Sequence, residues 1–140
     1  MIAIMLLAYS QSLPLLGSLE AALRSTYDRE LKVAPNHRTY QMFEVQRIRV
    51  SSLPALARFE MSPRTRRLYR IRLSMKGSDR CHIYEAIIRK PRGKPDDAEW
   101  GTRAYELTWK AKGSLPATHF WLYAYDGKNT RCDVTFGPRA

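Results

Sequence analysis

The chain has 140 residues and a mass of 16.2 kDa, a length that suits one domain, and we expect residues 1–140 to form it. Hydrophobic residues make up 44% of the sequence, which allows a sizeable core and argues against wholesale disorder. The 24 Lys and Arg residues outnumber the 13 Asp and Glu residues, so the formal net charge is +11. A polyanion is the simplest partner for such a surplus.

The N-terminus and the cysteines bear on the location of the protein. Residues 2–8 are apolar throughout, lack the positive region of a signal peptide and are too short to cross a bilayer. We expect a buried strand there, with a short core helix as the alternative. Two cysteines are too few for a disulfide framework or a four-cysteine zinc site, so we expect Cys81 and Cys132 to be buried free thiols. These features indicate a cytoplasmic protein with no membrane contact, no metal and no cofactor.

Apolar residues at spacings of three or four predict one amphipathic helix over residues 13–31. Ser12 is a plausible N-cap, Pro14 suits the first turn, and residues 33–36 end the helix. The apolar stripe consists of Leu16, Leu19, Leu23, Tyr27 and Leu31.

After residue 39, runs rich in Tyr, Ile, Val, Trp and Phe alternate with turn residues, which is typical of successive antiparallel strands. Residues 53–59 are ambiguous between a short helix and a loop, and the Gly and Pro content of residues 92–97 indicates a loop. We therefore expect an α+β fold, with one N-terminal amphipathic helix packed on a mainly antiparallel sheet of about five to seven strands. The expected strands are Tyr40–Val50, Leu68–Met75, Cys81–Arg89, Ala104–Lys112, His119–Tyr125 and Arg131–Phe136.

Two of these strands form the most informative predicted hairpin, which turns at residues 76–79. An even-length turn pairs Leu73 with His82 on an apolar face. The same register sets Arg70 opposite Glu85 on the other face. That second face is strongly basic.

Residues 64–94 contain eleven basic residues and only two acidic ones, so +9 of the chain's +11 lies there. Phosphate contacts would relieve the repulsion among these charges, and the planar fork of arginine suits both phosphates and stacked bases. The alternative is a solvated basic surface without a specific ligand. The predicted nucleic-acid contacts, mostly to phosphates, are Arg64, Arg66, Arg67, Arg70, Arg72, Arg89, Lys90, Arg92 and Lys94.

A second predicted hairpin turns at residues 126–129, and its register decides where an aromatic row points. An even turn pairs Trp121 with Val134 and places the row in the core, which is the register we favour. A three-residue loop with a bulge shifts the pairing by one residue and sets the row opposite Arg131 and Asp133, a wetter and more ligand-like position. The row consists of His119, Trp121, Tyr123 and Tyr125.

Further aromatic residues and the histidines are candidates for binding or chemistry. Trp100 and Tyr40 lie outside the best apolar alternations and are candidates for stacking on bases. A metal-independent ribonuclease needs a general base, a general acid and cations that stabilise the phosphorane. We expect His82 and His119 in the core and His37 in an exposed loop, and we assign no catalytic residue.

Residues 66–73 followed by 83–88 resemble the central basic hairpin of small α+β toxins that cleave RNA. We expect a nucleic-acid-binding protein, for RNA or DNA, that contacts phosphates through its basic hairpin face. One alternative is a small metal-independent, toxin-like ribonuclease, so whether the protein is an enzyme stays open. Another alternative is an interaction or inhibitor module that docks on an acidic protein partner. The sequence assigns neither sequence specificity nor oligomeric state.

Overall fold

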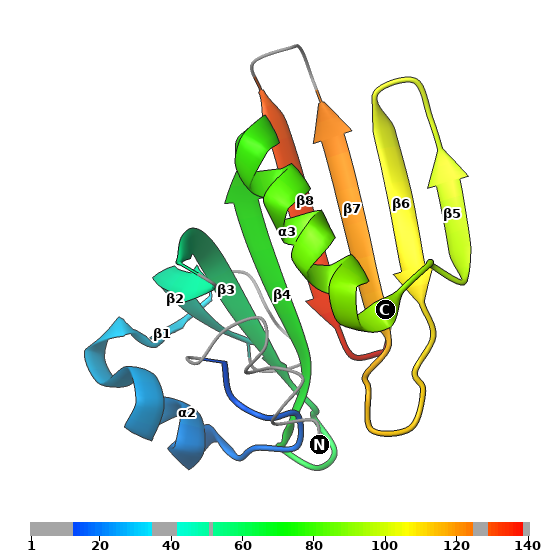
Figure 1. Cartoon of the computed structure of the whole chain (residues 1–140). Helices are drawn as coiled ribbons and strands as arrows, with labels where there is room; N and C mark the ends of the chain where they lie inside the picture. Colours follow the sequence, from blue (N-terminus) through cyan, green and yellow to red (C-terminus); the bar gives the residue numbers. More distant parts are fainter. Residues whose placement is uncertain (1–12, 35–41, 51, 125–128, 139–140) are drawn as a thin grey trace.

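A computed structural model describes residues 13–34, 42–50, 52–124 and 129–138 of the chain. The described residues form an eight-stranded sheet in the order β1-β2-β3-β4-β8-β7-β6-β5, and every neighbouring pair is antiparallel (Figure 1). The expected α+β fold with a mainly antiparallel sheet is therefore confirmed, but the sheet has more strands than we predicted. The strands are β1 (Lys32–Val33), β2 (Met42–Val50), β3 (Leu53–Met61), β4 (Leu68–Lys76), β5 (Asp97–Trp100), β6 (Ala104–Trp109), β7 (Thr118–Ala124) and β8 (Thr130–Phe136).

The sheet consists of two antiparallel halves that meet where β4 pairs with β8. Strands β1 to β4 follow one another across the first half, and β5 to β8 follow one another across the second half. Between the halves, the helix α3 (Ser78–Arg92) crosses one face of the sheet and leads to the edge strand β5 (Figure 1). This crossing places two segments that are distant in sequence, β4 and β8, side by side at the centre of the sheet.

The two faces of the sheet differ in chemistry because side chains alternate along each strand. On the side that α3 covers, Leu73 pairs with Val134, and both side chains are buried. The helix α2 (Glu20–Tyr27) packs on the same side, where the Tyr27 ring stacks on Phe59 with centroids 5.3 Å apart. We call the opposite side the polar face. Its side chains include Glu44, Arg58, Glu60, Arg70, Arg72, Ser74, Glu106, Thr108, His119, Trp121, Tyr123, Asp133 and Thr135.

The predicted strand Cys81–Arg89 is wrong, because this segment lies within α3. Its buried residues Cys81, Tyr84 and Ile88 follow a helical spacing of three and four and face the sheet. An acidic residue in the first turn and three basic residues in the last turn also suit the helix dipole. The basic hairpin that included this strand is absent, and the resemblance to the toxin hairpin is lost with it. His82, which we expected in the core, is exposed on the helix.

The helix predicted over residues 13–31 is present only in part, as α2. It begins at Glu20, and a 3-10 turn, η1 (Asp28–Glu30), follows it. Residues 13–19 instead run beside β4, where the Gly17 amide donates to the Leu68 carbonyl at 2.6 Å. Gly17 has a φ of +93°, which interrupts the helical backbone that the apolar spacing predicted.

Five of the six expected strands are present, as β2, β4, β6, β7 and β8. Residues 53–59, which we left open between helix and loop, lie in β3, and residues 97–100 form β5. The predicted strand at residues 2–8 lies outside the described residues. In the described part of the chain, no helix is both long and apolar enough to span a membrane.

Cys81 and Cys132 form a disulfide between α3 and β8, with their Cα atoms 5.8 Å apart. The prediction of two free thiols is therefore wrong. The bond ties the helix to β8, the central strand that carries Asp133 and Thr135 on the polar face. The cytoplasmic location, which relied partly on free thiols, stays a prediction.

Candidate functional site

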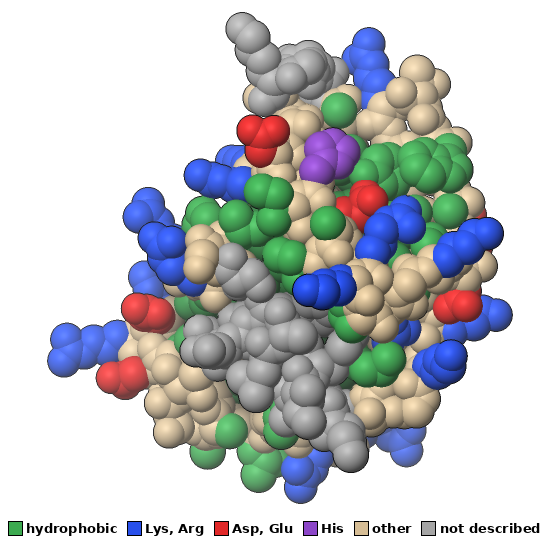
Figure 2. Space-filling model, viewed as in Figure 1, with side chains coloured by type: hydrophobic (Ala, Val, Ile, Leu, Met, Phe, Trp, Pro, Cys, Tyr) green, Lys and Arg blue, Asp and Glu red, His purple; other side chains and the backbone are tan. Residues whose placement is uncertain are grey.

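The residues predicted to contact nucleic acid lie in three separate places. Arg64, Arg66 and Arg67 are exposed in the loop between β3 and β4, and Arg70 and Arg72 lie on the polar face. Lys and Arg side chains are spread around the face that carries α3 and are not gathered over one element (Figure 2). Contacts by these residues stay a prediction, but one basic hairpin does not bring them together. The other four, in the last turn of α3 and the loop after it, are Arg89, Lys90, Arg92 and Lys94.

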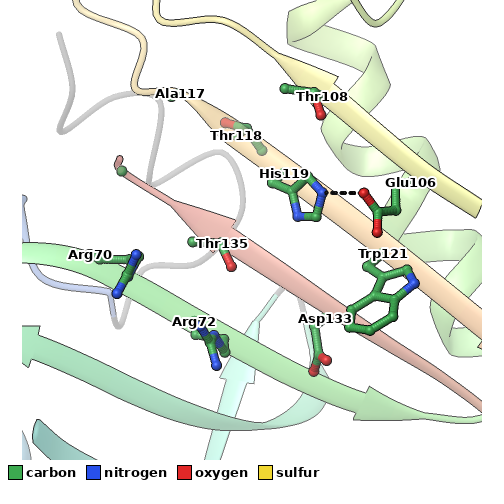
Figure 3. A pocket seen from close by; sticks show the side chains of 11 residues that line it. Arg70, Arg72, Glu106, Thr108, Ala117, Thr118, His119, Trp121, Asp133 and Thr135 are labelled. Carbon is green, nitrogen blue, oxygen red and sulfur yellow. Dashed lines mark hydrogen bonds and ion pairs between the residues drawn. The ribbon is translucent and has the colours of Figure 1, made fainter. Parts of the chain in front are cut away.

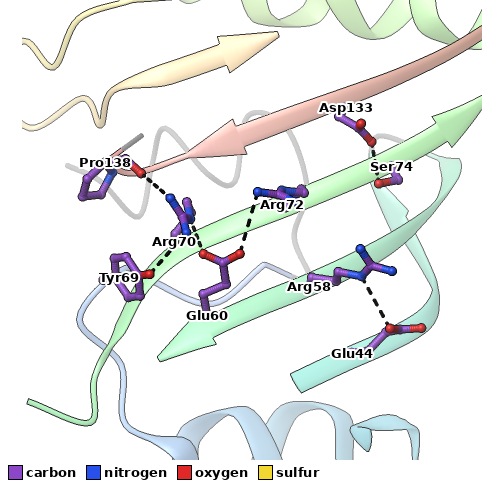
Figure 4. Close-up of polar contacts among 9 residues, drawn as sticks. All are labelled: Glu44, Arg58, Glu60, Tyr69, Arg70, Arg72, Ser74, Asp133 and Pro138. Atoms are coloured by element: carbon purple, nitrogen blue, oxygen red, sulfur yellow. Dashed lines mark hydrogen bonds and ion pairs between the residues drawn. The ribbon is translucent and has the colours of Figure 1, made fainter. Parts of the chain in front are cut away.

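Arg70 is buried in the sheet, because only 4% of its side chain is exposed. It pairs with Glu60 of β3, which is 1% exposed. Its guanidinium also donates to the Pro138 carbonyl at 3.1 Å and to the Tyr69 hydroxyl at 3.2 Å (Figure 4). Glu85, the partner that the sequence predicted, lies on α3 instead. Arg70 therefore joins β3, β4 and the segment after β8.

A pocket of about 290 Å³ opens on the polar face where β4, β8, β7 and β6 run side by side (Figure 3). It lies across the sheet from α3, which is drawn behind the strands in this view. The register sets His119 beside Thr135 and Trp121 beside Asp133. The favoured even-turn register, which buried this row, is wrong. The alternative register, with Arg131 and Asp133 opposite the row, is the one present.

His119 and Glu106 form a hydrogen bond inside this pocket (Figure 3). The His119 Nε2 atom lies 3.3 Å from the Glu106 Oε2 atom. An N–H group at Nε2 can donate to the carboxylate, which leaves Nδ1 with a lone pair that can accept a proton. The expectation that His119 lies in the core is wrong, and this arrangement suits acid–base chemistry.

Arg72 is the cationic group of the pocket that reaches solvent, with 36% of its side chain exposed. It approaches Glu60 at 3.9 Å, but the second oxygen of Glu60 binds the buried Arg70. Arg72 therefore shares Glu60 with Arg70. Its guanidinium has further N–H groups that can donate to an anionic ligand.

Trp121 provides an exposed ring at the same pocket, and its side chain is 40% exposed. Its ring lies 4.8 Å from that of Tyr123, whose hydroxyl donates to Asp133 at 3.2 Å. Asp133 also accepts a hydrogen bond from the Ser74 hydroxyl at 2.6 Å (Figure 4). These contacts orient the aromatic pair and leave the Trp121 ring available to a planar ligand.

Trp100, the other proposed stacking residue, is 70% exposed but lies on the opposite side of the sheet. It pairs with Tyr105 across β5 and β6, with ring centroids 4.6 Å apart. Tyr40 and His37 lie outside the described residues. A base that is bound in the pocket therefore cannot also stack on Trp100.

Three further residues line the pocket although none of them was predicted as a site residue: Glu106, Thr108 and Thr135. Each alternates with buried apolar residues of β6 or β8. This alternation could have identified the three residues from the sequence, because polar residues at every second position of a strand lie on one shared face.

Among the described residues, no group of three or more His, Cys, Asp or Glu side chains could hold a metal ion. Comparisons with protein-family models, with curated proteins and with solved structures found no match. The pocket is therefore the feature of the structure that points to a function.

Proposed function

We propose that the protein binds single-stranded nucleic acid at the pocket on the polar face of its sheet. One observation carries the proposal: the partly exposed Arg72 and the exposed Trp121 line the same pocket. The guanidinium fork matches the oxygens of a phosphate, and a base stacked on an aromatic ring contributes about 1–3 kcal/mol. The net charge of +11 supports a polyanionic ligand over a neutral one.

The test is a fluorescence-anisotropy titration of a labelled 2′-O-methyl octanucleotide over a series of salt concentrations. Arg72→Gln should lower the slope of log affinity against log salt by about 0.7, because one phosphate contact to a single strand is lost. Trp121→Ala should weaken binding by about 1–3 kcal/mol, or roughly 5- to 150-fold. Arg29→Gln and Trp100→Ala are the matched controls, because they remove an exposed arginine and an exposed indole elsewhere.

Two results would contradict the proposal. Control variants that weaken binding as much as the pocket variants would show that the pocket has no special role. Absence of binding even at low salt would also overturn it, and would leave an acidic protein as the partner to pursue.

A second candidate function, cleavage of RNA, is favoured by the His119–Glu106 pair in the pocket that contains Arg72. His119 would take the proton of the ribose 2′-hydroxyl at Nδ1 while Glu106 orients the ring through Nε2. The 2′-oxygen would attack phosphorus, the bond from phosphorus to the 5′-oxygen would break, and water would protonate the leaving oxygen. Arg72 would stabilise the charge on the phosphorane.

Incubation of an unmodified RNA with the protein in the presence of EDTA tests this second function on a denaturing gel. His119→Gln should slow cleavage by about 10²- to 10⁴-fold and leave the affinity for the 2′-O-methyl strand unchanged. His82→Gln is the control, because this histidine is exposed on α3 and distant from the pocket in the fold. Cleavage at the wild-type rate by His119→Gln would refute the assignment.

A further inference from the structure

A groove of about 670 Å³ lies at the end of the sheet where β2, β3, β4 and the start of α3 meet. Among the described residues that line it, four side chains are cationic and none is acidic. We call it the basic groove. Its cations are Arg47, Arg49, Lys76 and Arg80, all exposed.

Two backbone irregularities bring these cations together. A register shift between Val45 and Ile48 bulges β2 at Arg47, so the strand bends where the groove begins. Gly77, with a φ of +109°, turns the chain from β4 into α3, and this turn brings the side chains of Lys76 and Arg80 to the same groove. The groove is therefore built by the fold and does not depend on a run of charges in the sequence.

The basic groove adjoins the pocket at β4, and it extends from the polar face around the end of the sheet to Arg80 of α3 on the other side. Ser74 lines the groove, and its hydroxyl donates to Asp133, which lines the pocket. Arg72, Ser74 and Lys76 are alternate residues of β4 and point to the same face. Four residues of a strand span about 13 Å, so the Cα atoms of Arg72 and Lys76 are separated by about that distance.

The two hollows differ in charge. Within the pocket, Glu106 and Asp133 offset the charges of Arg70 and Arg72. In the basic groove, the described lining residues include four cations and no acidic residue to offset them. A polyanion held at the pocket would therefore gain most of its electrostatic attraction from the groove.

We infer that the basic groove binds the phosphates that flank the nucleotide in the pocket, so the ligand is a strand of several nucleotides. This inference rests on the proposed function. One phosphate cannot occupy both hollows, so the contribution of the groove appears only when the ligand has several phosphates. Each phosphate contact adds to the salt dependence of binding.

The experiment compares a dinucleotide, which has one internal phosphate, with a 2′-O-methyl octanucleotide. The test variant combines Arg47→Gln, Lys76→Gln and Arg80→Gln. The control variant combines Arg29→Gln, Lys32→Gln and Lys112→Gln, which remove three exposed cations outside both hollows. Affinities are measured by competition over a salt series, and circular dichroism checks that both variants are folded.

For the octanucleotide, the test variant should lower the salt slope by about 2 and the affinity by about 10- to 100-fold at ~0.1 M salt. Its affinity for the dinucleotide should equal that of the wild type, and the control variant should resemble the wild type. An octanucleotide affinity that the test variant leaves unchanged would overturn the inference while the pocket still binds. Equal losses in test and control variants would also overturn it. Failure of the wild type to bind either ligand would instead refute the proposed function.

Discussion

Replacing Arg70 by methionine tests whether this arginine supports the fold or contacts a ligand. The substitution keeps a long side chain but removes the charge that faces Glu60, whose side chain is 1% exposed. A buried carboxylate left without its partner destabilises a protein by about 3–5 kcal/mol. We expect the free energy of unfolding to fall by about 4 kcal/mol, a large part of the roughly 5–15 kcal/mol that stabilises an ordinary domain.

The matched variant combines Arg70→Met with Glu60→Leu and removes both charges. Apolar side chains in place of a buried ion pair are often neutral for stability, so the double variant should recover most of the loss. The coupling energy from the double-mutant cycle should exceed about 2 kcal/mol. Arg72 also loses Glu60, at 3.9 Å, but its exposed guanidinium makes this a small effect.

Urea unfolding followed by circular dichroism and tryptophan fluorescence measures the wild type, the single variants Arg70→Met and Glu60→Leu, and the double variant. The midpoint should move and the dependence on urea should not, because the exposed surface of the unfolded chain is nearly unchanged. If Arg70→Met unfolds at the wild-type midpoint and loses affinity for the octanucleotide, the structural role is refuted. Arg70 would then be the phosphate contact that the charge pattern predicted.

Reduction of the disulfide between Cys81 and Cys132 should lower the free energy of unfolding by about 4 kcal/mol, because it spans 51 residues. Urea unfolding with and without dithiothreitol measures this, and the double alanine variant has to be insensitive to the reductant. Gly137→Ala should destabilise the protein more than Gly113→Ala in thermal unfolding. Both glycines have positive φ, but only at Gly137 would a Cβ come within 3.2 Å of the β4 backbone. Burial is the main cause that raises the pKa of Tyr105 above its ordinary value, and a hydrogen bond to the Glu85 carboxylate is the second cause. Stability should therefore fall as the pH rises above about 10, where only the unfolded tyrosine ionises, and Tyr105→Phe should show a smaller fall.

The segment 78–92 shows why a helix was mistaken for a strand. Residues such as Cys81, Ile83 and Tyr84 favour strands by propensity, and a short apolar run fits either periodicity. The spacing of Cys81, Tyr84 and Ile88 was a helical signal, as was the glycine that follows the basic last turn. Packing against the sheet, which no local propensity describes, favours the helix.

The register of β7 and β8 could have been predicted from the alternation of their apolar residues. Phe120 and Leu122 pair with Val134 and Cys132, so the buried residues of both strands share one face. The prediction of the even-turn register instead assumed that amphipathic rings such as that of Trp121 are core residues. Tyrosine, tryptophan and histidine fit either face, so an aromatic row alone does not determine register.

The contrast between Arg70 and Arg72 could not be obtained by counting charges. Both occur in one basic run, but only Arg70 is the direct cross-strand neighbour of Glu60 and is buried against it. Glu60 belongs to a different strand, and only the sheet register brings it to this position. Local charge density therefore predicted a polyanion but could not separate a structural arginine from one available to a ligand.

Ultraviolet cross-linking of a single-stranded oligouridine to the protein, with mass spectrometry of the digested complex, tests most directly whether the pocket on the polar face is the binding site. If the strand binds at the pocket, we expect cross-links within β7 at Trp121 or Tyr123, and we expect Trp121→Ala to abolish them. Trp100 is the internal control, because it is more exposed but lies on the other side of the sheet. Cross-links that occur mainly at Trp100, or that persist unchanged in Arg72→Gln at elevated salt, would contradict binding at the pocket.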